Sequence, residues 1–329
     1  MLLGMITGIS GSGRKEYLKD FLAECERKGK KVKVYHIGQM LFEQARKVGV
    51  NITPENVLNT NPAVINSLRS AVLENVTGSI KQEARKYDLI LISLHTFFYW
   101  KKIFTRAYDW FYLKELSPDF FVTFIDKSQS IKARLDSRAQ WKDQNLSCEE
   151  ILLWQNIEVE VTADLAELYR KPFYVISVSQ PISTLYRLVF RPEMKLVYVS
   201  MPMTHLSAEK RAVDKFVERL RKYFIVFDPR TIEIEAKKIV PAIYHQTVKR
   251  DLYWLIKQCS KVVAFYPRVV SSPGVINELR EAYETNKDVW VIFPSKKVSP
   301  FLLYYSTKLF RNQQEFFKFL ESKVKETKK

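Results

Sequence analysis

The chain has 329 residues, 47% of them hydrophobic and 13% aromatic, which fits two ordinary globular domains and excludes a disordered or fibrous protein. Its formal net charge of +17 attracts phosphates, whether in nucleotides, nucleic acid or anionic lipid, and does not choose among them. The three widely spaced cysteines, Cys25, Cys148 and Cys259, have no C-x-x-C spacing, which argues against a disulfide framework or a zinc site.

The first residues, "MLLGMITGISGSGRK", have no basic segment ahead of the apolar ones, so we interpret them as a first strand and not as a signal peptide. The longest apolar stretch, Leu89–Trp100, has about a dozen residues, whereas about 20 are needed to cross a bilayer. We therefore expect a cytoplasmic protein that has no membrane partner.

Short β-branched and aromatic runs alternate with longer helical patterns, which predicts βαβ units and an α/β fold with parallel sheets. The predicted strands of the first half are 2–10, 31–37, 88–95, 119–126 and 172–178, and those of the second half are 195–201, 223–229, 261–267 and 288–294. A segment with a proline, Tyr186–Lys195, separates the halves, so the predicted domains are 1–191 and 192–329.

The first predicted strand leads through a glycine-rich loop into a helix, in "MITGISGSGRKEYL". Gly8, Gly11 and Gly13 allow backbone N–H groups to turn toward a phosphate, and the helix N-terminus adds partial positive charge. The pattern departs from a complete Walker A motif, G-x-x-x-x-G-K-[ST], because Arg14 replaces its Lys and Lys15 replaces the hydroxyl that binds magnesium. We expect these five residues to bind the phosphate of a nucleotide.

Together with this loop, the segments "DLILISLHT" and "IKARLDSRAQWKDQNLSCEEILLWQN" make the first half resemble P-loop nucleoside monophosphate kinases of the archaeal adenylate kinase type. The resemblance implies a kinase-like parallel sheet with flanking helices, ATP or another nucleotide at the loop, and lid arginines at Arg134 and Arg138. Ser93 stands where the family has a magnesium-holding carboxylate, so we expect phosphoryl transfer to be impaired. Nucleotide binding without transfer, and a retained fold with an empty loop, are the alternatives.

In the second half, "KLVYVSMPM", "RDLYWLIKQCSKVVAFYP" and "SSPGVINELREAYETNKDVWVIFP" together resemble the nucleoside 2-deoxyribosyltransferase superfamily, and most closely its 2'-deoxynucleoside 5'-phosphate N-hydrolases. The resemblance implies a Rossmann-like (flavodoxin-like) parallel sheet and cleavage of an N-glycosidic bond, for which no cofactor is required. It places the carboxylate nucleophile at Glu278 and a second carboxylate, which assists the departing base, at Asp251.

The same resemblance implies which residues bind the substrate. Ser272 stands where relatives that act on free nucleosides have an acid, and a serine suits a 5'-phosphate that an acid would repel. Gly274 and the start of the helix complete a seat for this phosphate. Tyr198 falls at a substrate-contacting position, and Ser299 matches a serine that the family donates across a dimer interface, so we expect a homodimer.

Glu278 and Asp251 each have a simpler interpretation. Glu278 could be an acid that stabilises the start of a helix through the helix dipole, and Asp251 could be an ordinary acid on the exposed surface of a helix. No pair among His95, His205 and His245 has the spacing of metal ligands, so no metal site is predicted. We expect an enzyme that hydrolyses or transfers the N-glycosidic bond of a nucleoside 5'-monophosphate.

Two other functions are open. One is a nucleotide kinase with an atypical phosphate loop, and the other is a catalytically silent protein that binds nucleotides or nucleic acid. A nucleic-acid partner is not favoured, because many of the basic residues are interleaved with acids on predicted helices, which is typical of a solvated helix face.

Overall fold

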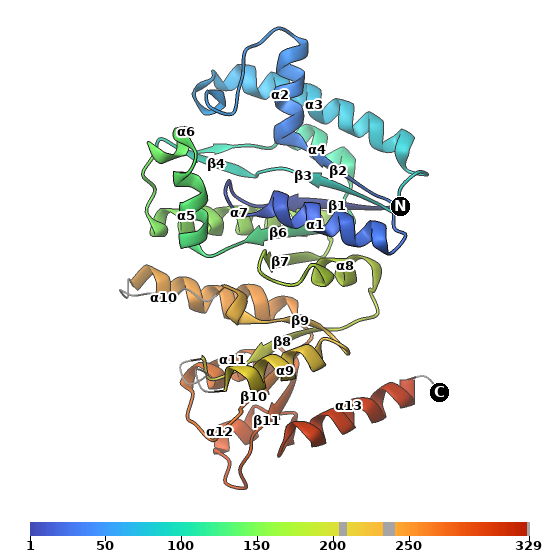
Figure 1. The fold of residues 1–329 in the computed structure, drawn as a ribbon, viewed down its shortest axis with the longest axis vertical. Coiled ribbons are helices and arrows are strands. Elements are labelled where there is room, and N and C mark those ends of the chain that lie inside the picture. Colours follow the sequence, from blue (N-terminus) through green and yellow to red (C-terminus); the bar gives the residue numbers. More distant parts are fainter. Residues whose placement is uncertain (204–208, 233–240, 328–329) are drawn as a thin grey trace. The chain divides into compact units, whose positions relative to one another are not determined.

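The computed structural model describes residues 1–203, 209–232 and 241–327, and the chain forms two compact units, Met1–Ile182 and Ser183–Lys329. Each unit contains a five-stranded parallel sheet flanked by helices (Figure 1), which confirms the predicted two-domain α/β class. The units divide at the start of helix α8 (Ile182–Phe190), whereas the sequence prediction divides the chain after this helix. His205 lies outside the described residues.

The sheet of the first unit has the strand order β2-β3-β1-β6-β7. Its strands are rich in β-branched and aromatic residues and are largely buried, as expected for a parallel sheet covered on both faces. A separate antiparallel hairpin, β4–β5, follows strand β3 in the chain, and the sequence did not predict it. The strands are β1 (Leu2–Thr7), β2 (Val32–His36), β3 (Leu89–Ser93), β4 (Phe97–Trp100), β5 (Ile103–Arg106), β6 (Phe120–Ile125) and β7 (Phe173–Ser177).

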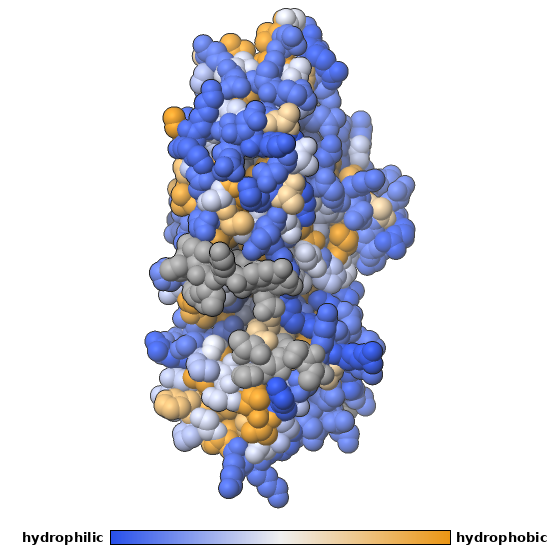
Figure 2. Space-filling view, turned by 60° about the vertical axis from the view of Figure 1, so that its left-hand side comes forward, coloured by the Kyte–Doolittle hydropathy of each residue, from blue (hydrophilic) through white to orange (hydrophobic). Residues whose placement is uncertain are grey.

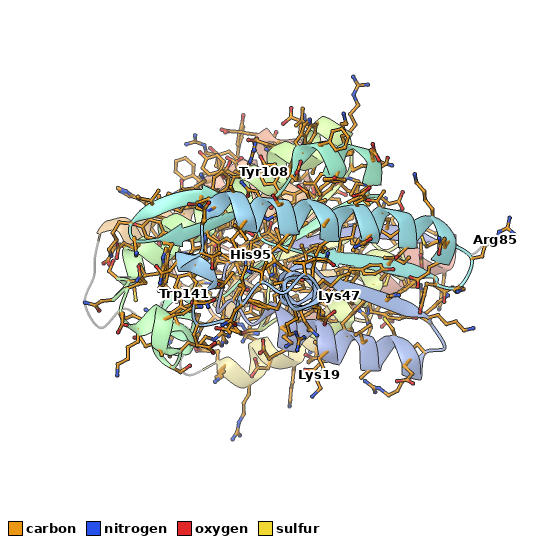
Figure 3. The ribbon with its side chains drawn as sticks, turned by 90° about the horizontal axis from the view of Figure 1, so that it is seen from above. Lys19, Lys47, Arg85, His95, Tyr108 and Trp141 are labelled. Atoms are coloured by element: carbon orange, nitrogen blue, oxygen red, sulfur yellow. The ribbon has the colours of Figure 1, made fainter. Side chains whose placement is uncertain are left out.

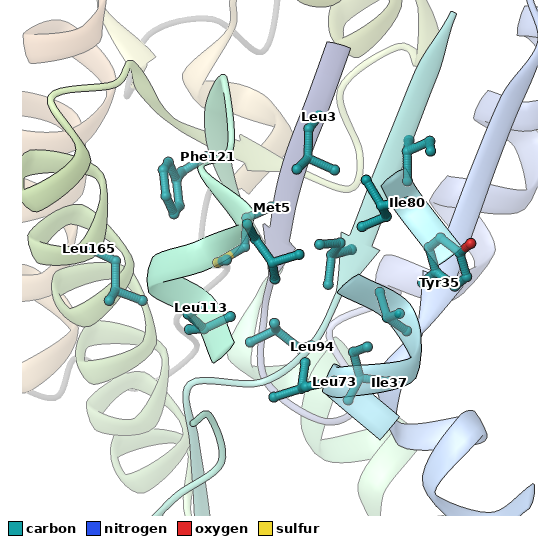
Figure 4. Packing of buried hydrophobic residues seen from close by; sticks show 14 of the residues in the cluster. Leu3, Met5, Tyr35, Ile37, Leu73, Ile80, Leu94, Leu113, Phe121 and Leu165 are labelled. Atoms are coloured by element: carbon teal, nitrogen blue, oxygen red, sulfur yellow. The ribbon is translucent and has the colours of Figure 1, made fainter. Parts of the chain in front are cut away.

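Helices cover both faces of this sheet. Figure 4 shows one hydrophobic core of the unit, in which Leu73, Leu113 and Leu165 from three different helices pack against strand residues such as Met5 and Phe121. On the opposite face Tyr17 packs against Phe124, with ring centroids 4.7 Å apart. The helices are α1 (Arg14–Arg27), α2 (Ile37–Lys47), the 3-10 turn η1 (Val57–Asn59), α3 (Pro62–Glu83), α4 (Trp110–Leu116), α5 (Ser128–Asp136), α6 (Ala139–Lys142) and α7 (Cys148–Tyr169).

The sheet of the second unit has the order β12-β11-β10-β8-β9. When the strands are numbered from one within the unit, this order is 5-4-3-1-2, which is the flavodoxin-like order. In such a sheet the strand connections change direction between the first and third strands. The predicted flavodoxin-like arrangement is thus confirmed, with a short fifth strand that the sequence did not predict. The strands are β8 (Leu196–Ser200), β9 (Ile225–Phe227), β10 (Lys261–Phe265), β11 (Asp288–Ile292) and β12 (Lys308–Phe310).

Two helices of the second unit, α9 (Lys210–Leu220) and α13 (Gln313–Thr327), pack on one face of the sheet, where the rings of Phe216 and Phe265 stack 4.1 Å apart. The opposite face carries α11 (Pro273–Glu284), which buries Leu279 and Ala282. The remaining helical segments are η3 (Pro229–Ile232), α10 (Pro241–Val248), the π-helix η4 (Lys249–Ile256) and α12 (Pro300–Tyr304).

No helix in the described part of the chain combines the length and the apolar character that a membrane span needs. Hydrophilic residues cover much of the face drawn in Figure 2, with hydrophobic ones scattered among them.

Candidate functional site

Glu278 lies in the second turn of α11, and the first turn of this helix contains no acid. Its carboxylate faces strand β8, where the Tyr198 hydroxyl donates to Oε1 at 2.8 Å and the Ser200 hydroxyl donates to Oε2. The helix dipole acts mainly within the first turn, so it does not explain an acid at this depth in the helix. The position of Glu278 is explained instead by two hydroxyls that hold both of its oxygens.

Burial and a neighbouring charge shift the protonation of Glu278. Burial is the larger cause and the nearby Asp251 carboxylate the second, and together they raise the pKa of Glu278 to about 8, although hydrogen bonds from Ser200 and Tyr198 oppose the rise. The pKa of the Tyr198 phenol is raised well above its usual value, first by burial and then by the charge of Glu278. The raised pKa therefore favours the protonated form of Glu278 at neutral pH.

Asp251 sits on the π-helix η4, a distortion that is frequent at functional sites. Its neighbour Arg250, which is 4% exposed, binds it through two parallel contacts, from Nε to Oδ1 at 2.9 Å and from Nη2 to Oδ2 at 3.1 Å. Arg250 also donates to the Ile232 carbonyl at 2.9 Å. Burial raises the pKa of Asp251 and the ion pair with Arg250 opposes that rise. Asp251 is therefore a fixed carboxylate beside Glu278, and the interpretation as an ordinary surface acid does not describe it.

The other residues predicted for this site lie at helix starts. Ser272 is the N-cap of α11, where its hydroxyl accepts from the Val275 N–H at 3.4 Å. Gly274 is exposed, and a side chain there would meet nothing within 4 Å. Ser299 is exposed at the N-cap position of α12, where its side chain makes no capping hydrogen bond. The structure thus brings Tyr198 to Glu278 and Asp251, and leaves the three small residues at the ends of helices.

In the first unit, the glycine-rich loop connects β1 to α1 at the carboxyl end of the sheet. Gly8, Gly11 and Gly13 have φ values of 146°, 76° and 82°, which L-residues rarely adopt. At Gly8 an added Cβ would lie 2.8 Å from the Phe124 carbonyl oxygen, so this position has no room for a side chain either. Because β1 lies between β3 and β6, the loop occupies the point where the strand connections change direction, a common ligand position in α/β sheets.

A buried carboxylate fixes the start of this loop. Glu158 on α7 is fully buried and accepts from the backbone N–H groups of Gly8 (3.0 Å), Thr96 (3.0 Å) and Phe97 (3.1 Å), and from the Thr96 hydroxyl (2.5 Å). Burial raises the pKa of Glu158, and these hydrogen bonds oppose the rise. The Gly8 N–H is therefore already bound by the protein, which leaves the rest of the loop to bind a phosphate.

Arg14 and Lys15 differ in where their side chains go. The Arg14 guanidinium donates to the Leu94 carbonyl at the end of β3, and its Nη2 lies 3.4 Å from His95 Nε2. Burial lowers the pKa of Arg14 to about 10, while the charge of Glu158 acts in the opposite direction. Lys15 is exposed at the start of α1 and borders the adjoining pocket. The Arg14 side chain is therefore held partly by contacts within the protein, whereas the Lys15 side chain is more accessible to a ligand.

The two lid arginines also take different roles. Arg134 donates to the Gly11 carbonyl at 2.7 Å and to Asp126 Oδ2 at 2.7 Å, so it braces the loop from α5. Arg138 is exposed and borders the pocket beside the loop. The structure thus brings both predicted arginines to the phosphate loop.

A pocket of about 540 Å³ opens on this loop. Besides the loop residues and the two arginines, it is lined by His36, Gln39, Ser93 and His95. Burial lowers the pKa of His36, as do the charges of Arg14 and Lys15. Figure 3 shows His95 inside the first unit, near Trp141. Ser93 lies in the pocket lining, and no group of three metal-binding side chains occurs among the residues that the structure describes.

Sequence patterns missed several of these residues. Gln155, Glu158 and Thr162 are spaced as neighbours on one side of α7, and all three are at most 4% exposed. Polar residues on the apolar side of a predicted helix could have indicated this buried network. No comparable signal existed for Arg250, because its role depends on its burial and on a contact with a distant segment.

Comparisons with known proteins give a weak likeness of fold. No family model and no curated protein matches the chain. Among solved structures, it is similar to a deoxyadenosine kinase from M. mycoides (13% identity, covering 58% of this chain and 98% of that one, TM-score 0.33), a sugar kinase from Janibacter sp. (14%, 58% and 93%, 0.32) and a shikimate kinase from Bacteroides thetaiotaomicron (14%, 57% and 97%, 0.35).

These matches are kinases, and each covers somewhat more than half of this chain. At such TM-scores the likeness bears on neither activity nor substrate, which must be argued from the residues of the two sites. None of the three bears on the deoxyribosyltransferase resemblance.

Proposed function

We propose that the second unit hydrolyses or transfers the N-glycosidic bond of (deoxy)nucleoside 5'-monophosphates, with Glu278 as the nucleophile. The observation that supports this most is the carboxylate of Glu278, which is held by two hydroxyls at the carboxyl end of a flavodoxin-like sheet, next to a second fixed carboxylate. The test is the release of free base from nucleoside and 2'-deoxynucleoside 5'-monophosphates, with Glu278→Gln as the variant.

The chemistry follows from the charge that develops during bond cleavage. As the base departs, the sugar C1' gains oxocarbenium character, and an ionised carboxylate can trap it covalently or stabilise it. Each carboxylate oxygen has two lone pairs, so Glu278 can accept from Tyr198 and Ser200 and still present an oxygen to C1'. In this proposal the two hydroxyls orient the nucleophile.

Asp251 is proposed to bind the departing base. Burial raises the pKa of both carboxyls, to about 8 at Glu278, and the ion pair with Arg250 opposes the rise at Asp251. The ion pair with Arg250 favours ionised Asp251, which in this proposal accepts a hydrogen bond from the base, and the departing base takes its proton from water. Arg250 fixes its orientation through the two parallel contacts.

The 5'-phosphate is proposed to bind at the start of α11. Ser272 and the exposed Gly274 precede Glu278 on this helix, so a phosphate at the N-terminus would place the sugar toward the carboxylate. A homodimer in which Ser299 reaches the partner's site belongs to the same proposal.

The rate of base release should rise with pH. Glu278 must be ionised to react and its pKa is raised to about 8, so kcat/KM is expected to increase roughly tenfold per pH unit below 8 and to level off above it. Asp251→Asn removes the negative charge that helps to raise this pKa, so its profile should bend at a lower pH even though its rate is lower. A rate that falls between pH 6 and 8 would contradict an ionised Glu278 as the nucleophile.

For the first unit, we propose that the phosphate loop binds a nucleotide. This rests on the three glycines with positive φ, the pocket of about 540 Å³ and the cations Lys15 and Arg138 that border it. The alternative of a nucleotide kinase needs a magnesium site, and Lys15 and Ser93 occupy the two positions where the family has magnesium ligands. Phosphorylation of a monophosphate by ATP would favour the kinase, and strongly salt-dependent binding of long polynucleotides would favour a silent binding protein.

Gly13→Ala should weaken nucleotide binding by roughly tenfold, because strain at such a φ costs on the order of 1–3 kcal/mol. Gly13 has a φ of 82°, and an added Cβ would lie 3.4 Å from both Arg134 Nη1 and Val178 Cγ2. The measurement is calorimetric titration of the full chain with ATP, with and without Mg²⁺. Gly29→Ala is the matched control, since Gly29 has a φ of 69°, open space around it and a position outside the loop. Equal affinities of the two variants would count against binding at the loop.

A further inference from the structure

The pocket at the phosphate loop continues into a second, mostly apolar chamber of about 220 Å³. The two cavities share lining residues that include Phe42, Leu94, His95 and Arg138, so they are contiguous. The walls of the second chamber come from α2, η1, α3 and α6 and the β4–β5 hairpin, and include Ile37, Leu41, Leu58, Ile65, Phe98 and Trp141. A third cavity of about 310 Å³ shares Leu58, Ile65, Arg69 and Phe98 with it.

One wall of this chamber carries a buried guanidinium. Arg69 on α3 is 7% exposed and borders both the chamber and the third cavity. A guanidinium has five N–H donors, and within the described residues its one hydrogen bond is to Asn66 Oδ1, at 2.8 Å. Burial lowers the pKa of Arg69 to about 10. The chamber thus contains a cation whose hydrogen-bonding capacity is largely unused.

Asp109, the acid whose charge acts on Arg69, already accepts hydrogen bonds from other groups. Asp109 acts to raise the pKa of Arg69, but its Oδ1 accepts from the Phe111 N–H at 2.9 Å and its Oδ2 from the Ser70 hydroxyl at 2.9 Å, and no ion pair between Asp109 and Arg69 is present in the described part of the chain. Arg106 adds a second positive charge nearby. The local charge at Arg69 therefore remains positive.

Two further polar atoms point to a ligand. His95 Nδ1 and Gln140 Oε1 are buried, both residues line the chamber, and neither atom makes a hydrogen bond of normal geometry within the described residues, although the Gly8 backbone lies close enough to His95 to oppose the lowering of its pKa. Buried polar groups in native proteins almost always have partners, and leaving one without a partner costs about 1–3 kcal/mol. Three incompletely bonded polar groups around one apolar chamber are explained if a ligand supplies the missing partners.

We infer that this chamber binds a small organic anion with an apolar body about the size of one ring. Its carboxylate or phosphate group would pair with Arg69, its ring would lie against Phe98, Leu58 and Ile65, and its hydrogen-bonding groups would meet His95 and Gln140. A neutral nucleobase would leave Arg69 unpaired, and a bare phosphate would leave the apolar walls in contact with water. This site goes beyond the function proposed for either unit and depends on neither.

The experiment is calorimetric titration of the full chain with benzoate, phenyl phosphate and benzyl alcohol, three one-ring probes that differ in their polar group. At least one of the two anions is expected to bind at least tenfold more tightly than neutral benzyl alcohol, and the comparison of the two anions identifies the preferred group. Arg69→Met should reduce that affinity at least tenfold. Arg85→Met removes the same charge from an exposed position that projects away from the unit (Figure 3), and it should leave the affinity unchanged.

Gln140→Leu provides a second test that does not depend on the buried charge. It keeps the size of the side chain and removes the unpaired oxygen, so it should weaken binding of the anion several-fold while thermal unfolding stays the same or shifts upward. The inference is overturned if neither anion binds, if benzyl alcohol binds as tightly as the anions, or if Arg69→Met and Gln140→Leu, checked as folded by circular dichroism, both bind like the unmodified chain.

Discussion

Glu278→Gln is expected to abolish the release of base from nucleoside 5'-monophosphates, with a loss on the order of 10³-fold or more in kcat, because an amide cannot act as the nucleophile. The side chain keeps its shape, and its amide can still hydrogen-bond to Tyr198 and Ser200, so folding should be retained. The measurement is chromatographic detection of free base from a panel of ribo- and deoxyribonucleoside 5'-monophosphates.

The same variant tests the environment of Glu278 without any substrate. A carboxyl whose folded-state pKa is raised from 4.5 to about 8 contributes stability below pH 4.5 that is lost as the pH rises through 8. Glutamine does not ionise, so the unfolding transition of the second unit should lie at a higher temperature in Glu278→Gln than in the unmodified chain at pH 9, and at a similar temperature at pH 4.5.

The two readouts of Glu278→Gln separate two kinds of failure. If the unmodified chain releases no base while the thermal difference at pH 9 is present, Glu278 is a buried acid without this activity, and the glycosidic proposal fails. If base release is the same in both proteins, another group is the nucleophile. Glu281→Gln is the matched control, since Glu281 lies on the same helix and is not the acid that Tyr198 and Ser200 bind.

Much of the fold could be predicted from the sequence because it follows from local patterns. The buried parallel strands are continuous apolar runs, and the glycines of the phosphate loop stand between a strand and a helix, so β1, α1 and the loop were predicted. The β4–β5 hairpin was not, because it merges with β3 into one apolar stretch. Its two-residue turn has positive φ at Lys101 (51°) and Lys102 (63°), where glycine or asparagine would normally indicate a turn.

The candidate sites were predictable only in part. Glu278, Asp251 and Tyr198 were predicted as site residues because the ordered motifs of the second half resemble a known superfamily, and they stay predictions. The ion pair of Arg250 with Asp251 and the incomplete bonding of Arg69 depend on burial, which a residue type alone does not reveal. Both arginines lie in ordinary helical sequence, where an arginine usually indicates a solvated position.

Glu158→Ala is expected to be the most destabilising of the substitutions considered, at a cost of about 3–5 kcal/mol to the first unit. It removes the acceptor of three backbone N–H groups, those of Gly8, Thr96 and Phe97, and leaves them buried without a partner. Glu160→Ala, at an exposed position on the same helix, should cost little. The measurement is hydrogen exchange of peptides that contain these amides, because unfolding of a chain with two units is not a single transition.

The pattern of hydrogen exchange shows whether the Glu158 carboxylate holds two segments of the unit together or fixes the glycine-rich loop alone. If Glu158 holds the end of β1 to the segment after β3, exchange in Glu158→Ala should accelerate at Gly8 and at Thr96–Phe97 together, and ATP binding should fall with it. Glu158→Gln should lie between the two alanine variants, since its amide keeps one acceptor oxygen but places two donors among N–H groups. Equal exchange in Glu158→Ala and Glu160→Ala would show that the loop is held by its glycine conformations and by Arg134, without the carboxylate.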